Sequence, residues 1–207
     1  MKVDFLIIGQ GLSGTVLAQT IESKSLSYHL IDKNDKITSS KVAAGIMHPM
    51  SFKRCIINWR GKEFYNYSNS FYKKSESIFN IKVYKKIKLV RLFSSFEEQN
   101  NWIGKSSDPI YSSIIGTKNT NIKNIKNYFG NSEVKMCSQL NVKEYLKGAK
   151  DYFLQSGNLT IGDFEDNLLT FDGDFYSYKG VQSKYIIFSQ GVNNLKNKLF
   201  DYLPIIP

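Results

Sequence analysis

The chain has little cysteine and no long apolar run. Its 207 residues contain only two cysteines, Cys55 and Cys137, which form neither a CxxC pair nor a metal-ligand spacing. No stretch approaches the roughly 18 apolar residues of a membrane-spanning helix. The N-terminus lacks the cationic start and small-residue cleavage site of a signal peptide. We therefore expect a cytoplasmic protein with no disulfide framework, no metal site and no membrane partner.

The chain is also poor in arginine, although it is rich in positive charge. Its formal net charge is +10, yet Arg54, Arg60 and Arg91 are its only arginines. Its lysines accompany asparagine and isoleucine, as in TKNTNIKNIKN at 117–127. This mixture favours solvated lysines over a phosphate-reading surface, so we do not expect a nucleic-acid partner. The excess positive charge would still attract an anionic cofactor or substrate.

The most informative feature that is present lies at the N-terminus. The apolar run at 5–8 is followed by Gly9, Gly11 and Gly14, and then by a segment with the apolar spacing of a helix. In a strand–loop–helix unit, the first glycine permits a tight turn, the second lets backbone approach a pyrophosphate, and the third lets helix and strand pack closely. The N-terminal N–H groups of the helix would then face an anion.

Asp32 completes this pattern, because it ends the next apolar run, 18 residues after Gly14. A carboxylate there accepts hydrogen bonds from a ribose diol and repels a 2′-phosphate, which favours FAD or NAD over NADP. The alternative is a tight turn in an unrelated α/β protein. The strand before the glycines, the helix after them and the acid beyond favour a dinucleotide site.

The rest of the chain predicts an interrupted α/β pattern. A helix is expected at 57–79, with Trp59, Phe64, Tyr67, Phe71 and Ile78 on one face packed in the core. Residues 81–93 are typical of two strands or one bent strand, and Ser95 with Glu98 forms a capping box before a helix that ends near 102. Residues 104–132 are expected to be loops with one or two edge strands.

The C-terminal part returns to alternating helices and strands. A helix is expected from Asn141 to Gly157, a strand at 159–161, a hairpin with strands at 168–171 and 175–178, and a buried strand at 185–189. One sheet built from both ends of the chain, with an inserted second lobe, accounts for this order.

Three segments together resemble the FAD-dependent oxidoreductases of the D-amino acid oxidase and glycine oxidase family. They are GQGLSG at 9–14 with Asp32, SSKVAAGIMHPM at 39–50, and YIIFSQGVNN at 185–194; LPIIP at 203–207 is similar to a later strand of the family. The resemblance covers essentially the whole chain but only the N-terminal part of the family's length. It implies a chain shortened or split before its substrate lobe is complete, with the apolar edge of Leu203, Ile205 and Ile206 exposed and prone to association.

The resemblance implies a fold and a division into domains. The fold is α/β, a Rossmann-like FAD-binding βαβ sheet domain with an inserted, incomplete α+β substrate lobe. Residues 1–80 and 136–200 would form the FAD-binding domain, residues 81–135 part of the substrate lobe, and residues 201–207 the start of a strand returning to that lobe.

The resemblance also implies a set of site residues. Gly9, Gly11, Leu12, Ser13 and Gly14 would hold the pyrophosphate, with Asp32 and Lys33 near the adenosine ribose. Ser39, Ser40, Ala43, Ala44 and Gly45 would line the path to the flavin, Phe164 would lie by the adenine and Gly191 by the flavin. His48 is a catalytic candidate that would face the flavin ring or carry a covalent flavin link; a loop histidine bonded to backbone is the other reading.

The function implied is oxidation of an amine or amino acid, in which a hydride passes from the carbon bearing the amine to the flavin and water hydrolyses the resulting imine. Three alternatives stay open. The chain could be a nucleotide-binding lobe that is inactive alone or is completed by a separate C-terminal chain. It could be an NAD-dependent enzyme using the same βαβ unit, or belong to the tRNA-modifying branch of the same flavin family.

Overall fold

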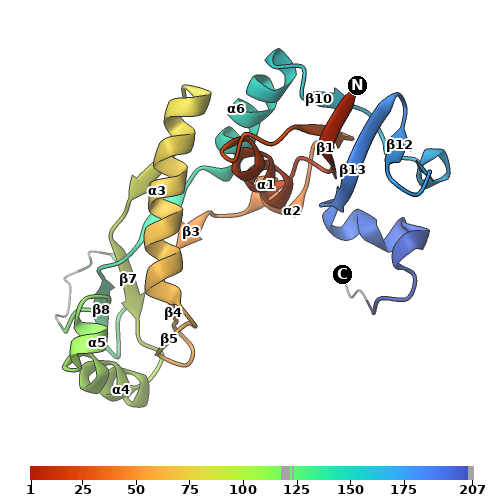
Figure 1. Ribbon diagram of the computed structural model, residues 1–207. Coiled ribbons are helices and arrows are strands. Elements are labelled where there is room, and N and C mark those ends of the chain that lie inside the picture. Colours follow the sequence, from red (N-terminus) through yellow and green to blue (C-terminus); the bar gives the residue numbers. More distant parts are fainter. Residues whose placement is uncertain (118–121, 123, 205–207) are drawn as a thin grey trace. The chain divides into compact units, whose positions relative to one another are not determined.

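The computed structural model describes residues 1–117, 122 and 124–204, and the chain forms two compact units (Figure 1). Unit 1 comprises Met1–Ala43 and Val142–Pro207, and unit 2 comprises Ala44–Asn141. The boundaries differ from the predicted ones at residues 80 and 135. The reason is the long helix α3 (Gly61–Phe79), which packs on strands of the middle segment; Ser138 there donates a 3.0 Å hydrogen bond to Asn69 of α3.

Unit 1 is built on one six-stranded sheet. Its spatial order is β10 (Leu159–Ile161), β2 (Tyr28–Asp32), β1 (Lys2–Ile8), β13 (Val181–Phe188), β12 (Tyr176–Tyr178) and β11 (Thr170–Phe171). The first four strands are parallel, and β12 and β11 form an antiparallel edge. Strand order reverses at β1, because the chain proceeds from β1 to β2 to β10 on one side and later places β13 on the other.

The apolar end of β1 is buried on both faces of this sheet, as parallel strands require. Leu6 and Ile8 pack with Tyr178 on one face, and Ile7 between them points to the other. Two helices of unit 1, α1 (Leu12–Glu22) and α6 (Val142–Gln155), lie next to each other beside the sheet (Figure 1). The buried Tyr145 hydroxyl of α6 donates a 2.6 Å hydrogen bond to Gln19 of α1. The βαβ unit and the late strand therefore share one core, as the sequence predicts.

Most of the elements expected in the C-terminal part are confirmed. Helix α6, strand β10 and the β11–β12 hairpin around Asp172–Gly173 are present, although 168 is in a short 3-10 turn, η1 (Asp166–Leu168). Strand β13 begins at Val181, before the predicted 185, because its polar first half pairs with β1 and β12. The chain then forms η2 (Gly191–Lys196) and η3 (Lys198–Phe200). Residues 201–204 form a turn and a bend, not a strand, and Ile205 and Ile206 lie outside the described residues.

Unit 2 combines helices with small antiparallel sheets. Its elements besides α3 are β3 (Ile46–Met47), β4 (Met50–Ser51), β5 (Ile56–Ile57), β6 (Tyr84–Lys86), β7 (Leu89–Leu92), α4 (Phe96–Ser106), α5 (Pro109–Ser112), β8 (Asn131–Val134) and β9 (Ser138–Leu140). The sheets are β3–β9–β6, β4–β5 and β7–β8. Both cysteines are unpaired and lie in a core around Trp102. Residues 81–93 form two strands, which is the first of the two predicted arrangements, whereas the segment after 102 contains helix as well as strand.

Helix α4 begins with half of the predicted capping box. The Ser95 hydroxyl accepts a 3.1 Å hydrogen bond from the Glu98 N–H, which is the first half of a capping box. The Glu98 carboxylate, however, accepts from the Ser94 N–H rather than the Ser95 N–H. It also pairs with Arg91 at 2.7 Å, so the helix start is tied to β7.

The predicted core face of α3 is wrong. The helix begins at Gly61 rather than 57, and it buries Tyr65, Tyr72 and Phe79. The predicted row is largely solvent-exposed: Trp59 is 77% exposed, Tyr67 64% and Phe64 48%. The buried row lies one residue further along the chain, about 100° around the helix from Phe64, Phe71 and Ile78, and packing within unit 2 selects it.

The positive charge is not spread evenly between the units. Unit 2 contains 16 of the 28 lysines and arginines but only 6 of the 18 aspartates and glutamates, so it carries the whole net charge of +10. Unit 1 has 12 of each and is formally neutral. Unit 1 has no net charge of its own, so its own attraction for an anion rests on local groups. In the described part of the chain, no helix is both long enough and apolar enough to span a bilayer.

His29 gives unit 1 a pH-dependent stability. Its ring is buried in β2, where Nε2 lies 2.8 Å from the Thr160 hydroxyl and Nδ1 has no hydrogen-bond partner among the described residues. Burial lowers the pKa of His29, because a second ring proton would be an unpaired buried donor. The unfolded chain, with a histidine pKa near about 6.5, then binds more protons than the folded chain.

We therefore expect the contribution of His29 to stability to be full above about pH 6.5 and to be lost as pH falls toward its depressed folded pKa. Urea denaturation of the wild type and of His29→Gln between pH 5.5 and 7.5 measures this difference. The free energy of unfolding should fall with acid more steeply in the wild type, and parallel pH profiles for the two proteins would contradict the assignment.

Candidate functional site

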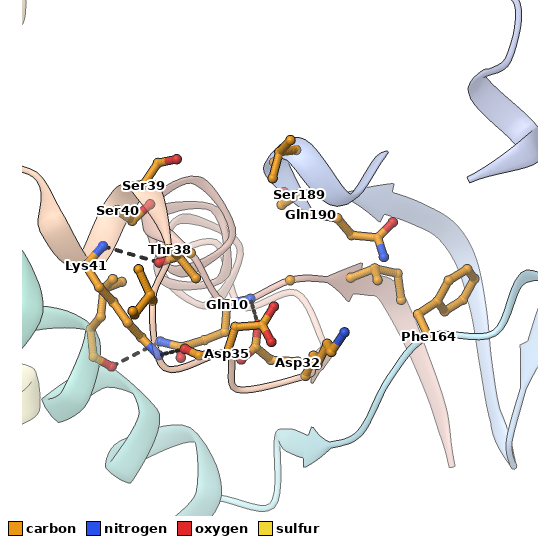
Figure 2. Close-up of a pocket in the computed structure, with 18 of the residues that line it drawn as sticks. Gln10, Asp32, Asp35, Thr38, Ser39, Ser40, Lys41, Phe164, Ser189 and Gln190 are labelled. Carbon is orange, nitrogen blue, oxygen red and sulfur yellow. Dashed lines mark hydrogen bonds between the residues drawn. The ribbon is translucent and has the colours of Figure 1, made fainter. Parts of the chain in front are cut away.

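The candidate site lies where the parallel strands of unit 1 end. β1, β2, β10 and β13 present their carboxyl ends at one edge of the sheet, and ligands of open α/β sheets bind there, where the strand order reverses. A pocket of about 240 Å³ occupies this position. Its lining comes from the loops after β1, β2, β10 and β13, from α2 (Ser39–Val42), and from Leu146 of α6 (Figure 2).

The glycine loop after β1 is shaped by close backbone approach. Gly9 has a φ of +102°, and a Cβ there would lie 2.5 Å from the Ser189 carbonyl oxygen. A Cβ on Gly14 would lie 1.9 Å from the Gly9 carbonyl oxygen. A Cβ on Gly11 meets nothing closer than the Ser40 hydroxyl at 3.4 Å. The outer glycines are therefore required by the fold, whereas Gly11 leaves free space beside the pocket.

Helix α1 points its N-terminus at the same loop. Its first intrahelical bond runs from the Thr15 N–H to the Gly11 carbonyl, so the earlier N–H groups face beyond the helix end. The Leu12 N–H donates to the Ser40 hydroxyl at 3.3 Å. These N–H groups and the positive end of the helix dipole suit a negatively charged group.

Asp32 is held by backbone at the end of β2. One carboxylate oxygen accepts from the Gln10 N–H and the other from the Asn34 N–H, both at 2.8 Å. These bonds fix the carboxylate beside the glycine loop and leave lone pairs for a further donor. The next residue, Lys33, is exposed and pairs with Asp163 at 3.4 Å, which joins the β2 loop to the β10 loop.

The segment after β2 forms one wall of the pocket. The Thr38 hydroxyl caps α2 by accepting from the Lys41 N–H at 3.3 Å, and the Lys41 ammonium donates to the Asp35 carbonyl. These bonds turn the chain so that Ser39 and Ser40 line the pocket (Figure 2). Small hydroxyl-bearing residues suit an anion-binding wall.

Phe164 forms another part of the wall and is packed from behind. Its ring stacks on Tyr178 at 4.8 Å and meets Phe188 edge-on at 5.4 Å. The Tyr178 hydroxyl accepts from the Glu165 N–H at 3.1 Å and donates to the Asp163 carbonyl at 3.2 Å. Phe164 therefore packs against the core of unit 1 and also lines the pocket.

The structure brings together about half of the residues suggested from sequence. Those that line the pocket are Gly9, Gly11, Asp32, Lys33, Ser39, Ser40, Phe164 and Gly191. Leu12, Ser13, Gly14 and Ala43 belong to unit 1 but do not line it, and Ala44, Gly45 and His48 belong to unit 2. His48 stacks on Phe52 at 4.1 Å, and burial lowers its pKa.

Several pocket residues had no sequence signal of their own. They are Gln10, Ile37, Leu146, Ser189, Gln190 and Val192. Gln10 lies inside the glycine motif at a position where the motif accepts any residue. Ser189 and Gln190 lie at the end of a strand, directly before Gly191, and that position is the sequence signal that could identify them.

The comparisons with known proteins concern the fold. No protein-family model matches the chain. Its structure is similar to the L-amino acid deaminase from Proteus vulgaris, with a TM-score of 0.66 and 15% identity over 93% of this chain and 48% of the other. It is also similar to the iminodiacetate oxidase from Chelativorans sp. BNC1, with a TM-score of 0.70 and 13% identity over 93% and 56%.

The glycine oxidase from Bacillus cereus is similar as well, with a TM-score of 0.62 and 13% identity over 90% of this chain and 54% of the other. The chain thus spans about half the length of each of these three structures. At these identities the likeness establishes the fold. The resemblance seen in sequence is confirmed at that level, because a glycine oxidase and an L-amino acid deaminase share this fold.

Proposed function

We propose that the chain binds FAD across the glycine loop of unit 1 and, as a flavoprotein, takes part in the oxidation of an amine or amino acid. The observation that carries the proposal is the pocket itself. It brings a glycine cradle, a helix N-terminus and a backbone-held carboxylate to the reversal point of a parallel sheet. Each of these groups is suited to bind one part of a dinucleotide: the glycine loop and the helix N-terminus its pyrophosphate, and the carboxylate its ribose.

The residues present fit the adenosine and pyrophosphate part of such a cofactor. Gly11 leaves open the space that a pyrophosphate would need, and the N–H groups of α1 would donate to its oxygens. Asp32 would accept from the ribose hydroxyls, and the Phe164 ring would offer an apolar surface to the adenine. The pocket is smaller than the roughly 300–1000 Å³ of sites that enclose a drug-sized ligand, so it would hold only part of the dinucleotide.

FAD would supply the electron acceptor for removing a hydride from the carbon that bears the amine. The residues of this chain would bind and orient the cofactor, and the formally neutral unit 1 would do so through local donors. No catalytic side chain is required for proton transfer if the amine binds uncharged. His48 remains a candidate for a residue beside the flavin ring. The candidates for the path from the pyrophosphate to that ring remain Ala43, Ala44 and Gly45.

A second candidate is a nucleotide-binding half that has no activity of its own and works with further polypeptide. The observation in its favour is the size of the pocket, which at about 240 Å³ would hold only part of a dinucleotide. A reducing cytoplasmic setting would suit both candidates, since both buried cysteines are unpaired.

The visible absorption spectrum of the purified chain, before and after incubation with FAD, tests the proposal. A flavin spectrum that persists through gel filtration supports it, and acid precipitation shows whether the link is covalent. Titration with NAD in parallel addresses the NAD-dependent alternative. Failure to retain or bind FAD, together with measurable binding of NAD, would replace the flavin proposal by that alternative.

Asp32→Ala is expected to weaken FAD binding by about 1–3 kcal/mol, because ribose hydroxyls that lose a buried acceptor are left unpaired. The Gln10 and Asn34 N–H groups also lose their acceptor, so the loop itself is loosened. Isothermal titration of the wild type, Asp32→Ala and Asp32→Asn measures the effect, and Asp32→Asn should be intermediate because it keeps one acceptor. Unchanged affinity in Asp32→Ala would remove this residue from the site.

A further inference from the structure

Gln190 carries a polar group that the fold leaves without a partner. It lines the pocket directly after β13, and its side-chain oxygen Oε1 is buried with no hydrogen-bond partner among the described residues. In Figure 2 the amide is directed to the side of the pocket where Phe164 lies. A buried acceptor without a donor destabilises the folded chain. A ligand that brings a donor would remove this cost once the side chain turns its oxygen into the pocket, because Oε1 is closed to solvent in the free chain.

The other glutamine of the pocket shows the contrast. Gln10 is 7% exposed, and its Nε2 donates to the Thr15 hydroxyl at 3.0 Å and to the Leu146 carbonyl at 3.1 Å. Those bonds connect the glycine loop to α1 and α6. The side chain of Gln10 thus stabilises the fold through hydrogen bonds, whereas the amide oxygen of Gln190 makes none to the described residues.

We propose that Gln190 is a ligand-binding residue whose side-chain oxygen accepts a hydrogen bond from the adenosine half of the bound dinucleotide. The inference rests on the proposed function and adds a specificity residue to it. Gln190 shares its pocket with Asp32 and Phe164, the residues that would face ribose and adenine. Ribose hydroxyls and the adenine amino group are the donors on that half, and phosphates have none to offer. The residue therefore complements the glycine loop, which supplies only donors.

Gln190→Met is the variant that separates a binding role from a structural one. Methionine keeps the length of the side chain but has no comparable acceptor. The free energy of unfolding without ligand should be unchanged or higher, because the unpaired acceptor is gone. Affinity for ADP and for FAD should fall by about tenfold, which corresponds to roughly 1.4 kcal/mol. A structural residue would instead lose stability and affinity together.

Gln10→Met is the matched control, since it makes the same chemical change in the same pocket. It should lower the free energy of unfolding, because two hydrogen bonds are lost. Gln190→Ala provides a second variant that lacks the acceptor, should the methionine variant not fold. Unfolding is followed by urea titration and binding by calorimetry, with ADP, FAD and FMN as the probes.

The outcomes separate this inference from the function on which it rests. Tenfold weaker ADP binding in Gln190→Met, with unchanged or higher stability, supports it. Equal ADP affinity in the wild type and both Gln190 variants overturns it and leaves FAD binding standing. Loss of FAD affinity with unchanged ADP affinity overturns the assignment to the adenosine half. A wild type that binds neither FAD nor ADP overturns the inference together with the proposed function.

Discussion

Gly14→Ala is expected to destabilise unit 1 severely. The added Cβ would lie 1.9 Å from the Gly9 carbonyl oxygen and 3.1 Å from its carbon, both in backbone that cannot rotate away. Relief requires α1 to move away from the end of β1, which disturbs the buried packing of helix on sheet. Overpacking of this kind costs about 1–3 kcal/mol and sometimes more. We expect about 3 kcal/mol or more here, since the contact is with backbone.

Urea denaturation followed by far-ultraviolet circular dichroism measures this effect. Gly162→Ala is the control, because Gly162 also lies in unit 1 and a Cβ there meets no atom within 4 Å. It should change the free energy of unfolding by no more than about 0.5 kcal/mol. A Gly14→Ala protein as stable as this control would show that the helix does not approach the loop as closely as described.

The part of the site that lies close together in sequence could be predicted from sequence. Gly9, Gly11, Gly14 and Asp32 belong to one βαβ unit, and their spacing reflects local constraints on turn, helix and strand. The positive φ of Gly9 and the contact at Gly14 are the physical reasons for those glycines. The late strand was also predictable, since its apolar second half is typical of a buried strand.

The parts that depend on tertiary contacts could not be predicted. On α3, the row of Phe64, Phe71 and Ile78 and the row of Tyr65, Tyr72 and Phe79 have the same seven-residue period. Periodicity alone cannot choose between them, and packing within unit 2 buries the second row. The uneven distribution of positive charge between the two units could not be predicted either. It emerges only when the boundaries at Ala43 and Asn141 are known, because the lysines are distributed along both units.

Gln190 illustrates the same limit inside the site. Its neighbour Gly191 can be predicted from sequence, because glycine at a strand end permits close backbone approach. Whether the glutamine amide finds a partner depends on side chains from loops after other strands. That information exists only in the folded chain, where Oε1 has no partner among the described residues.

Gly11→Val is expected to abolish FAD binding while the chain still folds. Gly11 has a φ of −72° and a ψ of −169°, an extended backbone conformation that any residue adopts. Its added Cβ meets only the Ser40 hydroxyl at 3.4 Å, a contact that the serine side chain can relieve by rotation. Valine is a poorer helix N-cap than glycine, which costs about 1 kcal/mol. The branched side chain would, however, fill the space that the pyrophosphate needs beside the first N–H groups of α1.

Calorimetric titration with FAD, alongside urea denaturation, separates these two effects. Gly162→Val introduces the same side chain in unit 1 at a position that does not line the pocket, and it should keep wild-type affinity. Gly11→Val should show no measurable binding, with a free energy of unfolding within about 1 kcal/mol of the wild type. Gly14→Ala, by contrast, should lose both stability and binding. Equal FAD affinity in Gly11→Val and the wild type would mean that the phosphates do not cross this loop.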